Sequence, residues 1–130
     1  MKALFDTNIL IDYFNGEQKA KKEIELYDIH AISIITYIEI IVGLQNVEES
    51  KVIKNFLHHF STIGVDLPVA ERTALLRKKY KLKIPDAIIL ATAEHHQYLL
   101  LLFRIFLKIF LKFWRHCLRS CRGNKSKYTK

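Results

Sequence analysis

Short apolar runs alternate with longer amphipathic segments along residues 1–98, and each kind of segment has its own spacing. Short runs of mostly apolar or β-branched residues predict strands at 2–5, 31–35 and 61–65. Apolar positions three or four residues apart predict helices at 9–14, 17–27, 36–44, 48–60, 68–80 and 87–96. This alternation favours an α/β fold with a parallel sheet and helices on both faces.

Two acids stand where such elements begin or end. Asp6 follows the first predicted strand, and in open α/β sheets ligands bind at the carboxyl ends of the strands. Asp is also a good helix N-cap, so Asp6 has a structural as well as a functional interpretation. Asp86 lies in the first turn of an apolar helix, where the helix dipole favours a negative charge.

Glu39 is the only acid in the apolar segment 34–44. Burying an unpaired carboxylate is costly, so Glu39 must bind a cation, be protonated, or reach solvent or a lysine. Clustered carboxylates repel one another, so Asp6, Glu39 and Asp86 together predict a bound hard cation, Mg²⁺ or Mn²⁺. Such ions promote the hydrolysis of phosphodiester bonds.

Three segments resemble the acidic motifs of PIN domains, in the same order: 4–12 (LFDTNILID), 33–44 (SIITYIEIIVGL) and 84–93 (IPDAIILATA). The resemblance covers residues 1 to 98 and implies a PIN-like three-layer α/β fold. The length of the chain is similar to that of VapC-type toxins of bacterial toxin–antitoxin pairs. This resemblance implies a Mg²⁺-dependent endoribonuclease that forms a homodimer, cleaves RNA with water as the nucleophile, and is neutralised by a cognate antitoxin protein.

Carried over to this sequence, the resemblance implies that Asp6 and Asp86 are direct metal ligands. Glu39 would be a further ligand, either directly or through a water molecule. Thr7 and Asn8 would orient Asp6, with helix capping as their alternative role. Asp12 follows in the same motif and receives no firm role.

The character of the chain changes after Gln97. Residues 1–94 contain all thirteen acids and twelve Lys or Arg, whereas residues 95–130 contain nine Lys or Arg and no acid. The overall net charge of +8 therefore belongs to the tail and does not by itself indicate that the body binds nucleic acid. Basic residues three or four apart in an apolar tail predict a helix suited to an anionic membrane surface, but too charged to span a membrane.

The tail also departs from the PIN pattern, which has a final strand and a fourth acid in this region. We interpret the change as a shift of reading frame near residue 99, with a natural tail of separate function as the alternative. The chain is accordingly divided into a PIN-like domain, 1–98, with an atypical final strand region, and a basic apolar tail, 99–130. The missing acid leaves a second function open: an inactive or impaired PIN remnant that still binds antitoxin or RNA.

The remaining signals are weaker. Two cysteines, Cys117 and Cys121, favour a reducing compartment, and Asp6 interrupts any secretory signal, so a cytoplasmic location is expected. Besides these cysteines and His116, a tetrahedral zinc site would need further ligands at suitable spacing, which the tail does not offer. The histidine pairs 58–59 and 95–96 are expected to be ordinary helix-end residues. The basic cluster 77–83 is either a solvated helix end or a contact for the RNA backbone beside Asp86.

Overall fold

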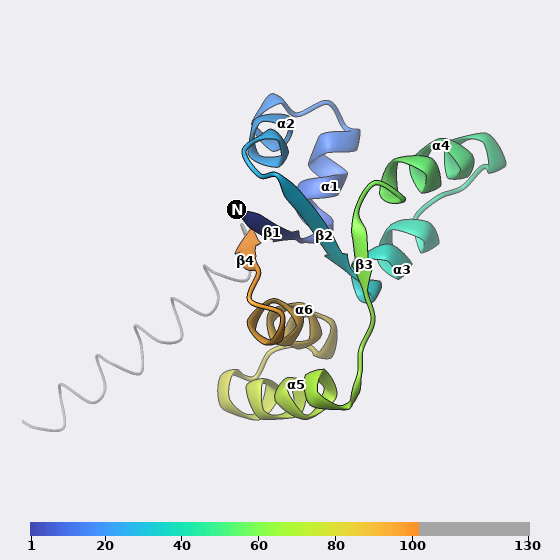
Figure 1. Cartoon of the computed structure of the whole chain (residues 1–130). Coiled ribbons are helices and arrows are strands. Elements are labelled where there is room, and N and C mark those ends of the chain that lie inside the picture. Colours follow the sequence, from blue (N-terminus) through green and yellow to red (C-terminus); the bar gives the residue numbers. More distant parts are fainter. Residues whose placement is uncertain (102–130) are drawn as a thin grey trace, which may run out of the picture.

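The computed structural model describes residues 1–101, which form a parallel sheet with helices on both faces (Figure 1). The strands are β1 (Lys2–Phe5), β2 (Ile29–Ser33), β3 (Ser61–Ile63) and β4 (Leu99–Leu101), in the order β3-β2-β1-β4. The helices are α1 (Thr7–Phe14), α2 (Gln18–Glu25), α3 (Ile34–Val42), α4 (Val47–Leu57), α5 (Leu67–Tyr80) and α6 (Ile84–His95). The predicted α/β fold is confirmed, and the bounds of the predicted elements are off by at most three residues.

Alternate strand residues face two different helical layers. Phe5 and Ile32 point into the core formed with α1 to α4. Leu4 and Ala31 point the other way and pack against Ile89 of α6. Helix α5 covers the outer side of α6, which completes the three-layer arrangement seen in Figure 1. Because residues 3–5 of β1 and 31–32 of β2 are buried on both faces, these stretches are apolar without alternation.

The path of the chain across the sheet reverses beside β1. The strands β1, β2 and β3 follow one another in one direction, and the chain then crosses the other face through α5 and α6 to place β4 on the far side of β1. In open parallel sheets, ligands bind outside the carboxyl ends of the strands at such a switch point. Asp6 directly follows β1, so the topology puts the first predicted acid at this point.

The strand β4 carries the sheet beyond the boundary that we expected at residue 98. Leu99 and Leu101 pair in parallel register with Ala3 and Phe5 of β1. The expectation that the tail is helical from residue 99 is therefore wrong for its first three residues, because an uninterrupted apolar run suits a strand beside a buried neighbour. The rest of the tail, 102–130, lies outside the described residues, and the helix predicted there stays a prediction.

Residues 1–101 contain no helix with both the length and the apolar character needed to cross a membrane.

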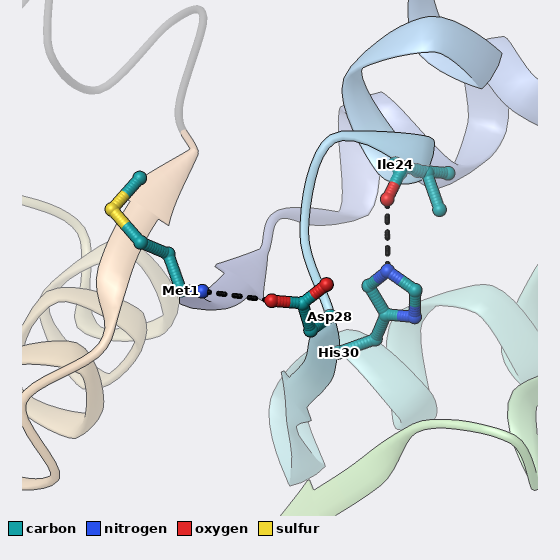
Figure 2. Close-up of polar contacts among 4 residues, drawn as sticks. All are labelled: Met1, Ile24, Asp28 and His30. Atoms are coloured by element: carbon teal, nitrogen blue, oxygen red, sulfur yellow. Dashed lines mark hydrogen bonds and ion pairs between the residues drawn. The ribbon is translucent and has the colours of Figure 1, made fainter.

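Polar contacts join the amino ends of β1 and β2, as Figure 2 shows. The amino group of Met1 lies 3.2 Å from Oδ2 of Asp28. His30 Nε2 lies 2.8 Å from the carbonyl oxygen of Ile24, and the His30 ring packs against Phe5 with the ring centroids 5.5 Å apart. The ion pair is highly exposed, so we expect it to add little stability, and the ring contact to contribute more to the junction of α2 and β2.

The turn after α6 contains a residue in the left-handed region. Gln97 has φ 57°. The N–H of Tyr98 donates to the carbonyl oxygen of Ala93 at 2.9 Å, and the N–H of Gln97 donates to the carbonyl oxygen of Glu94 at 3.3 Å. These two bonds form a Schellman C-cap, in which glycine is the favoured residue at the left-handed position.

Replacing Gln97 by glycine should therefore stabilise the domain. Gly removes the strain of a Cβ at positive φ, whereas the greater freedom of the unfolded chain offsets part of that gain. We therefore expect the free energy of unfolding to increase by about 0.5 kcal/mol. Urea denaturation measures the change. As the reverse substitution, Gly16→Ala at φ 81° should lower the free energy of unfolding. A loss of stability in Gln97→Gly would show that the Gln97 side chain makes contacts worth more than the strain.

Candidate metal-binding active site

The Asp6 side chain is held in place at the junction of β1 and α1. It is only 3% exposed. Its Oδ1 accepts the backbone N–H of Asn8 at 3.3 Å, and its Oδ2 accepts the Asn8 side-chain amide at 3.2 Å. Asp6 is thus the N-cap of α1, as one of its two interpretations predicted, and Asn8 fixes the orientation of both carboxylate oxygens.

The electrostatic setting of Asp6 disfavours its ionised form. Burial raises the pKa of Asp6, the hydrogen bonds from Asn8 lower it, and the negative charge of Asp86 raises it again. Asp86 lies in the first turn of α6 and is half-buried. The fold therefore brings the third acid of the motifs close enough for its charge to act on the first.

Glu39 reaches this region from α3. The Thr7 hydroxyl donates to Oε2 of Glu39 at 2.8 Å and lies 3.4 Å from the hydroxyl oxygen of Thr36. Since Thr7 follows Asp6 in the chain, one hydrogen bond connects the second acid to the segment that carries the first. Thr7 thus has a contact that helix capping does not explain.

Glu39 is exposed, so its carboxylate reaches solvent as well as the Thr7 hydroxyl, and its role as a metal ligand stays a prediction. The apolar sequence of α3 was misleading because this helix leaves apolar side chains uncovered: Ile38 is 48% exposed and Val42 79% exposed.

Two buried hydroxyl residues lie at the same edge and had received no role from the sequence. Ser33 ends β2, the neighbour of β1, and its Oγ accepts the N–H of Ile35 at 3.2 Å. Thr36 is fully buried beside Thr7. A signal was present, because Ser33 stands between a strand and the helix that it caps, much as Asp6 does.

The donor set at this edge fits a hard cation. Among the described residues, no Lys, Arg or His forms an ion pair with Asp6, Glu39 or Asp86. A buried carboxyl with a raised pKa beside a second carboxylate favours a divalent cation with oxygen ligands, which would neutralise both.

The grouping of the three acids is loose. Within residues 1–101, one set of three His, Cys, Asp or Glu side chains has ligand atoms all within 4.8 Å of one another, and it is Asp66, His95 and His96. Asp6, Glu39 and Asp86 do not meet that limit, so their action as one metal site stays a prediction.

The other candidate residues are placed as follows. Asp12 is exposed on α1. Arg77 at the end of α5 donates to the carbonyl oxygen of Leu82. The pair 58–59 is exposed at the end of α4, as expected. Residues 116, 117 and 121 lie outside the described part of the chain.

The raised pKa of Asp6 predicts a pH-dependent stability in the absence of metal. The folded state holds the Asp6 proton more tightly than the unfolded state does. Protonated Asp6 therefore stabilises the folded state below the ordinary Asp pKa of about 4, and this stabilisation is lost as the pH rises through the raised pKa of the folded state. Asp6→Asn retains a capping oxygen and removes this loss. In a chelating buffer it should be more stable than the wild type at neutral pH and similar to it below pH of about 4.

Thermal denaturation between acidic and neutral pH measures this difference. Asp12→Asn, on the exposed side of the same helix, is the matched control and should follow the wild type at every pH. If Asp6→Asn is the less stable protein at neutral pH, the hydrogen bonds of the carboxylate outweigh the cost of burying its charge.

The comparisons with known proteins agree with this geometry. The sequence profile described as PIN domain matches residues 3–103. Ribonuclease VapC1 of Methanocaldococcus jannaschii is 34% identical over 90 residues, which cover 66% of this chain and 62% of that protein. The chain thus spans less than two thirds of the length of this curated relative.

Solved structures share the arrangement of strands and helices. A toxin–antitoxin complex from Klebsiella pneumoniae is 46% identical, with a TM-score of 0.72, over 75% of this chain and 82% of that chain. VapBC2 from Rickettsia felis, bound to a DNA fragment from its promoter, is 20% identical with a TM-score of 0.70, over 81% and 89% of the two chains. VapBC-1 from nontypeable Haemophilus influenzae is 22% identical with a TM-score of 0.69, over 88% and 94%. The last two show likeness of fold alone.

The matched region contains the parallel sheet, the switch point beside β1 and all three acidic motifs. With residues 3–103 of its 130 matched by the family profile, the chain belongs to the PIN domain family.

Proposed function

We propose that this protein is a metal-dependent endoribonuclease and the toxin of a type II toxin–antitoxin pair. The observation that carries the proposal is the buried Asp6 beside Asp86 at the switch point of the sheet, with Glu39 joined to the same edge through Thr7. The 46% identity to a chain of the Klebsiella toxin–antitoxin complex and the likeness to Ribonuclease VapC1 support the same function.

Asp6 and Asp86 would hold Mg²⁺ or Mn²⁺ directly, and Glu39 would do so directly or through a water molecule. A bound ion of this kind lowers the pKa of a water molecule and stabilises the negative charge that develops on a phosphate. The role of Asn8 is to hold both oxygens of Asp6, and the role of Thr7 is to fix the orientation of the exposed Glu39 side chain.

RNA as the substrate is supported by the charge near Asp86. Lys78 and Lys79, in the last turn of α5, and Lys83, three residues before Asp86, are all exposed. Residues 1–94 have nearly balanced charge, so a local basic surface is what would attract a phosphate backbone to this edge. The function of the basic cluster 77–83 as an RNA contact is part of the proposal.

A cognate antitoxin and a second copy of the chain are the proposed protein partners. The uncovered apolar residues of α3 and α4 support such contacts, since Val42 is 79% and Val47 69% exposed. An open groove lined by Ile41, Leu44 and Val47 lies between these helices. Apolar surface of this kind is typical of protein interfaces.

The alternative function is an inactive PIN remnant that binds RNA or antitoxin without cleavage. It is favoured by the absence of any acid after Glu94. The same observation supports the proposal that the sequence from residue 99 results from a shifted reading frame, in which case the basic apolar tail could attach the protein to a membrane surface.

Removing either central carboxylate should abolish RNA cleavage. Asp6→Asn and Asp86→Asn should each lower kcat/KM by more than the roughly 10- to 100-fold that loss of a supporting residue costs at a metal site. Asp12→Asn, an exposed acid of the same first motif, should cleave at the wild-type rate. The measurement is cleavage of RNA by the purified full chain in Mg²⁺, followed by gel electrophoresis.

Mg²⁺ should also raise the melting temperature of the wild type more than that of Asp86→Asn, since an ion that binds only the folded state stabilises it. Cleavage by Asp6→Asn at the wild-type rate would contradict the proposal and leave Asp6 as a helix cap. A wild-type chain that binds RNA and never cleaves it would establish the remnant instead.

Removing two lysines from the proposed RNA surface should weaken binding. Lys78→Ala with Lys79→Ala should lower the affinity for single-stranded RNA and reduce the salt dependence of log K by about 0.7 for each phosphate that a lysine no longer neutralises. The control is Lys21→Ala with Lys22→Ala, an exposed pair on α2, which should bind as the wild type does. Fluorescence anisotropy at several salt concentrations measures the affinity and its salt dependence. If log K falls with salt concentration equally steeply in both double variants, the cluster 77–83 does not contact RNA.

A further inference from the structure

A second group of metal-ligating side chains lies at the other end of α6 from Asp86. Asp66 caps α5, His95 is the last residue of α6, and His96 follows it. The ligand atoms of these three side chains are all within 4.8 Å of one another. His95 is nine positions after Asp86 along one helix, which is about 14 Å at 1.5 Å per residue. The group is therefore distinct from the proposed active site.

The packing of α5 against α6 brings the three residues together. The two helices are joined by a short connection, 81–83, and share a core that includes Val69, Leu76 and Ala91. Arg72 Nε lies 2.7 Å from Oε2 of Glu94, which ties the second turn of α5 to the last turn of α6. The start of α5 thus lies beside the end of α6.

Within the described residues, each of the three side chains has a ligand atom that takes part in no hydrogen bond or ion pair. Asp66 uses Oδ1 to accept the N–H of Val69 at 3.0 Å, and Oδ2 has no hydrogen bond or ion pair in residues 1–101. His96 is half-buried, and within the described residues its Nε2 is a buried polar atom without a hydrogen-bond partner. Such atoms are rare in folded proteins and call for a partner. The ring of His95 lies beside that of His96, with their centroids 4.9 Å apart.

The backbone around the two histidines is fixed by contacts on several sides. The N–H of His96 donates to the carbonyl of Thr92 at 3.1 Å, and Lys2 Nζ donates to the carbonyl of His96 at 2.9 Å. The Schellman turn at Gln97 holds the next two residues. The histidines also lie at the negative end of the α6 dipole, which favours a cation.

We propose that Asp66, His95 and His96 form a second metal site, which binds a divalent transition metal of the Zn²⁺ type. Two imidazoles and one carboxylate, with a fourth position open to water or another ligand, are a donor set that Zn²⁺ accepts. Mg²⁺ prefers oxygen ligands only, so the acidic edge and this site select different metals. A bound ion ties the segment before α5 to the turn that leads into β4.

The test is the binding of Zn²⁺ to the full chain, carrying Cys117→Ser and Cys121→Ser so that thiolates contribute nothing. Excess Mg²⁺ is present to occupy the acidic edge. Isothermal titration calorimetry should show one Zn²⁺ per chain and a rise in melting temperature. Asp66→Asn keeps the helix cap, because Asn serves that role as well as Asp, and should lower the affinity at least tenfold. His95→Asn, at an exposed position, should do the same.

The matched control is His58→Asn, which removes one member of the other adjacent histidine pair, exposed at the end of α4. It should bind Zn²⁺ as the parent does. Co²⁺ added in place of Zn²⁺ should give the visible spectrum of a low-coordinate site, absent in Asp66→Asn. Unchanged Zn²⁺ affinity in both Asp66→Asn and His95→Asn would overturn the proposal. Loss of the Zn²⁺ equivalent in Asp6→Asn would overturn it too, by moving the ion to the acidic edge.

Discussion

The burial of β1 between two parallel neighbours is the constraint on which the rest of the structure depends. Where such a strand is covered on both faces, it carries apolar side chains, and Ala3, Leu4 and Phe5 of β1 are fully buried. Asp6 is the first charged residue after this buried stretch, and its carboxylate emerges at the carboxyl edge, where β2 ends in Ser33. The same constraint forces the chain to cross the sheet between β3 and β4, and this crossing brings α6 and Asp86 to that edge.

Most of the fold was readable from the sequence because its strands and helices follow the simple spacing rules. The parallel sheet, the helical layers and the N-cap at Asp6 came from local patterns alone. The exposure of Glu39 did not, because an apolar helix reads the same whether it faces a core or a surface that awaits a partner. Ile38 and Val42 lie on such an uncovered surface, and no single-chain pattern distinguishes them from core residues.

The candidate site was only partly predictable for a related reason. The sequence identified the acids, and the family resemblance ordered them, but neither gave the hydrogen bond from Thr7 to Glu39 or the buried hydroxyls of Ser33 and Thr36. The histidine pair at 95–96 looked no different from the pair at 58–59, since the residue that distinguishes it, Asp66, is about thirty residues away in the chain. Contacts between distant segments depend on helix packing, which spacing does not encode.

The pairing of β4 with β1 has a consequence for how the protein is made. Leu101, near the end of the domain, pairs with Phe5, near its beginning. While the chain is being synthesised, β1 has an open edge until nearly the whole domain has left the ribosome. Contacts between such distant residues close slowly, and an exposed apolar strand edge invites pairing with other chains in the meantime. The nascent domain is thus most exposed to aggregation just before its last strand arrives, which is also when the carboxyl edge that holds Asp6 is completed.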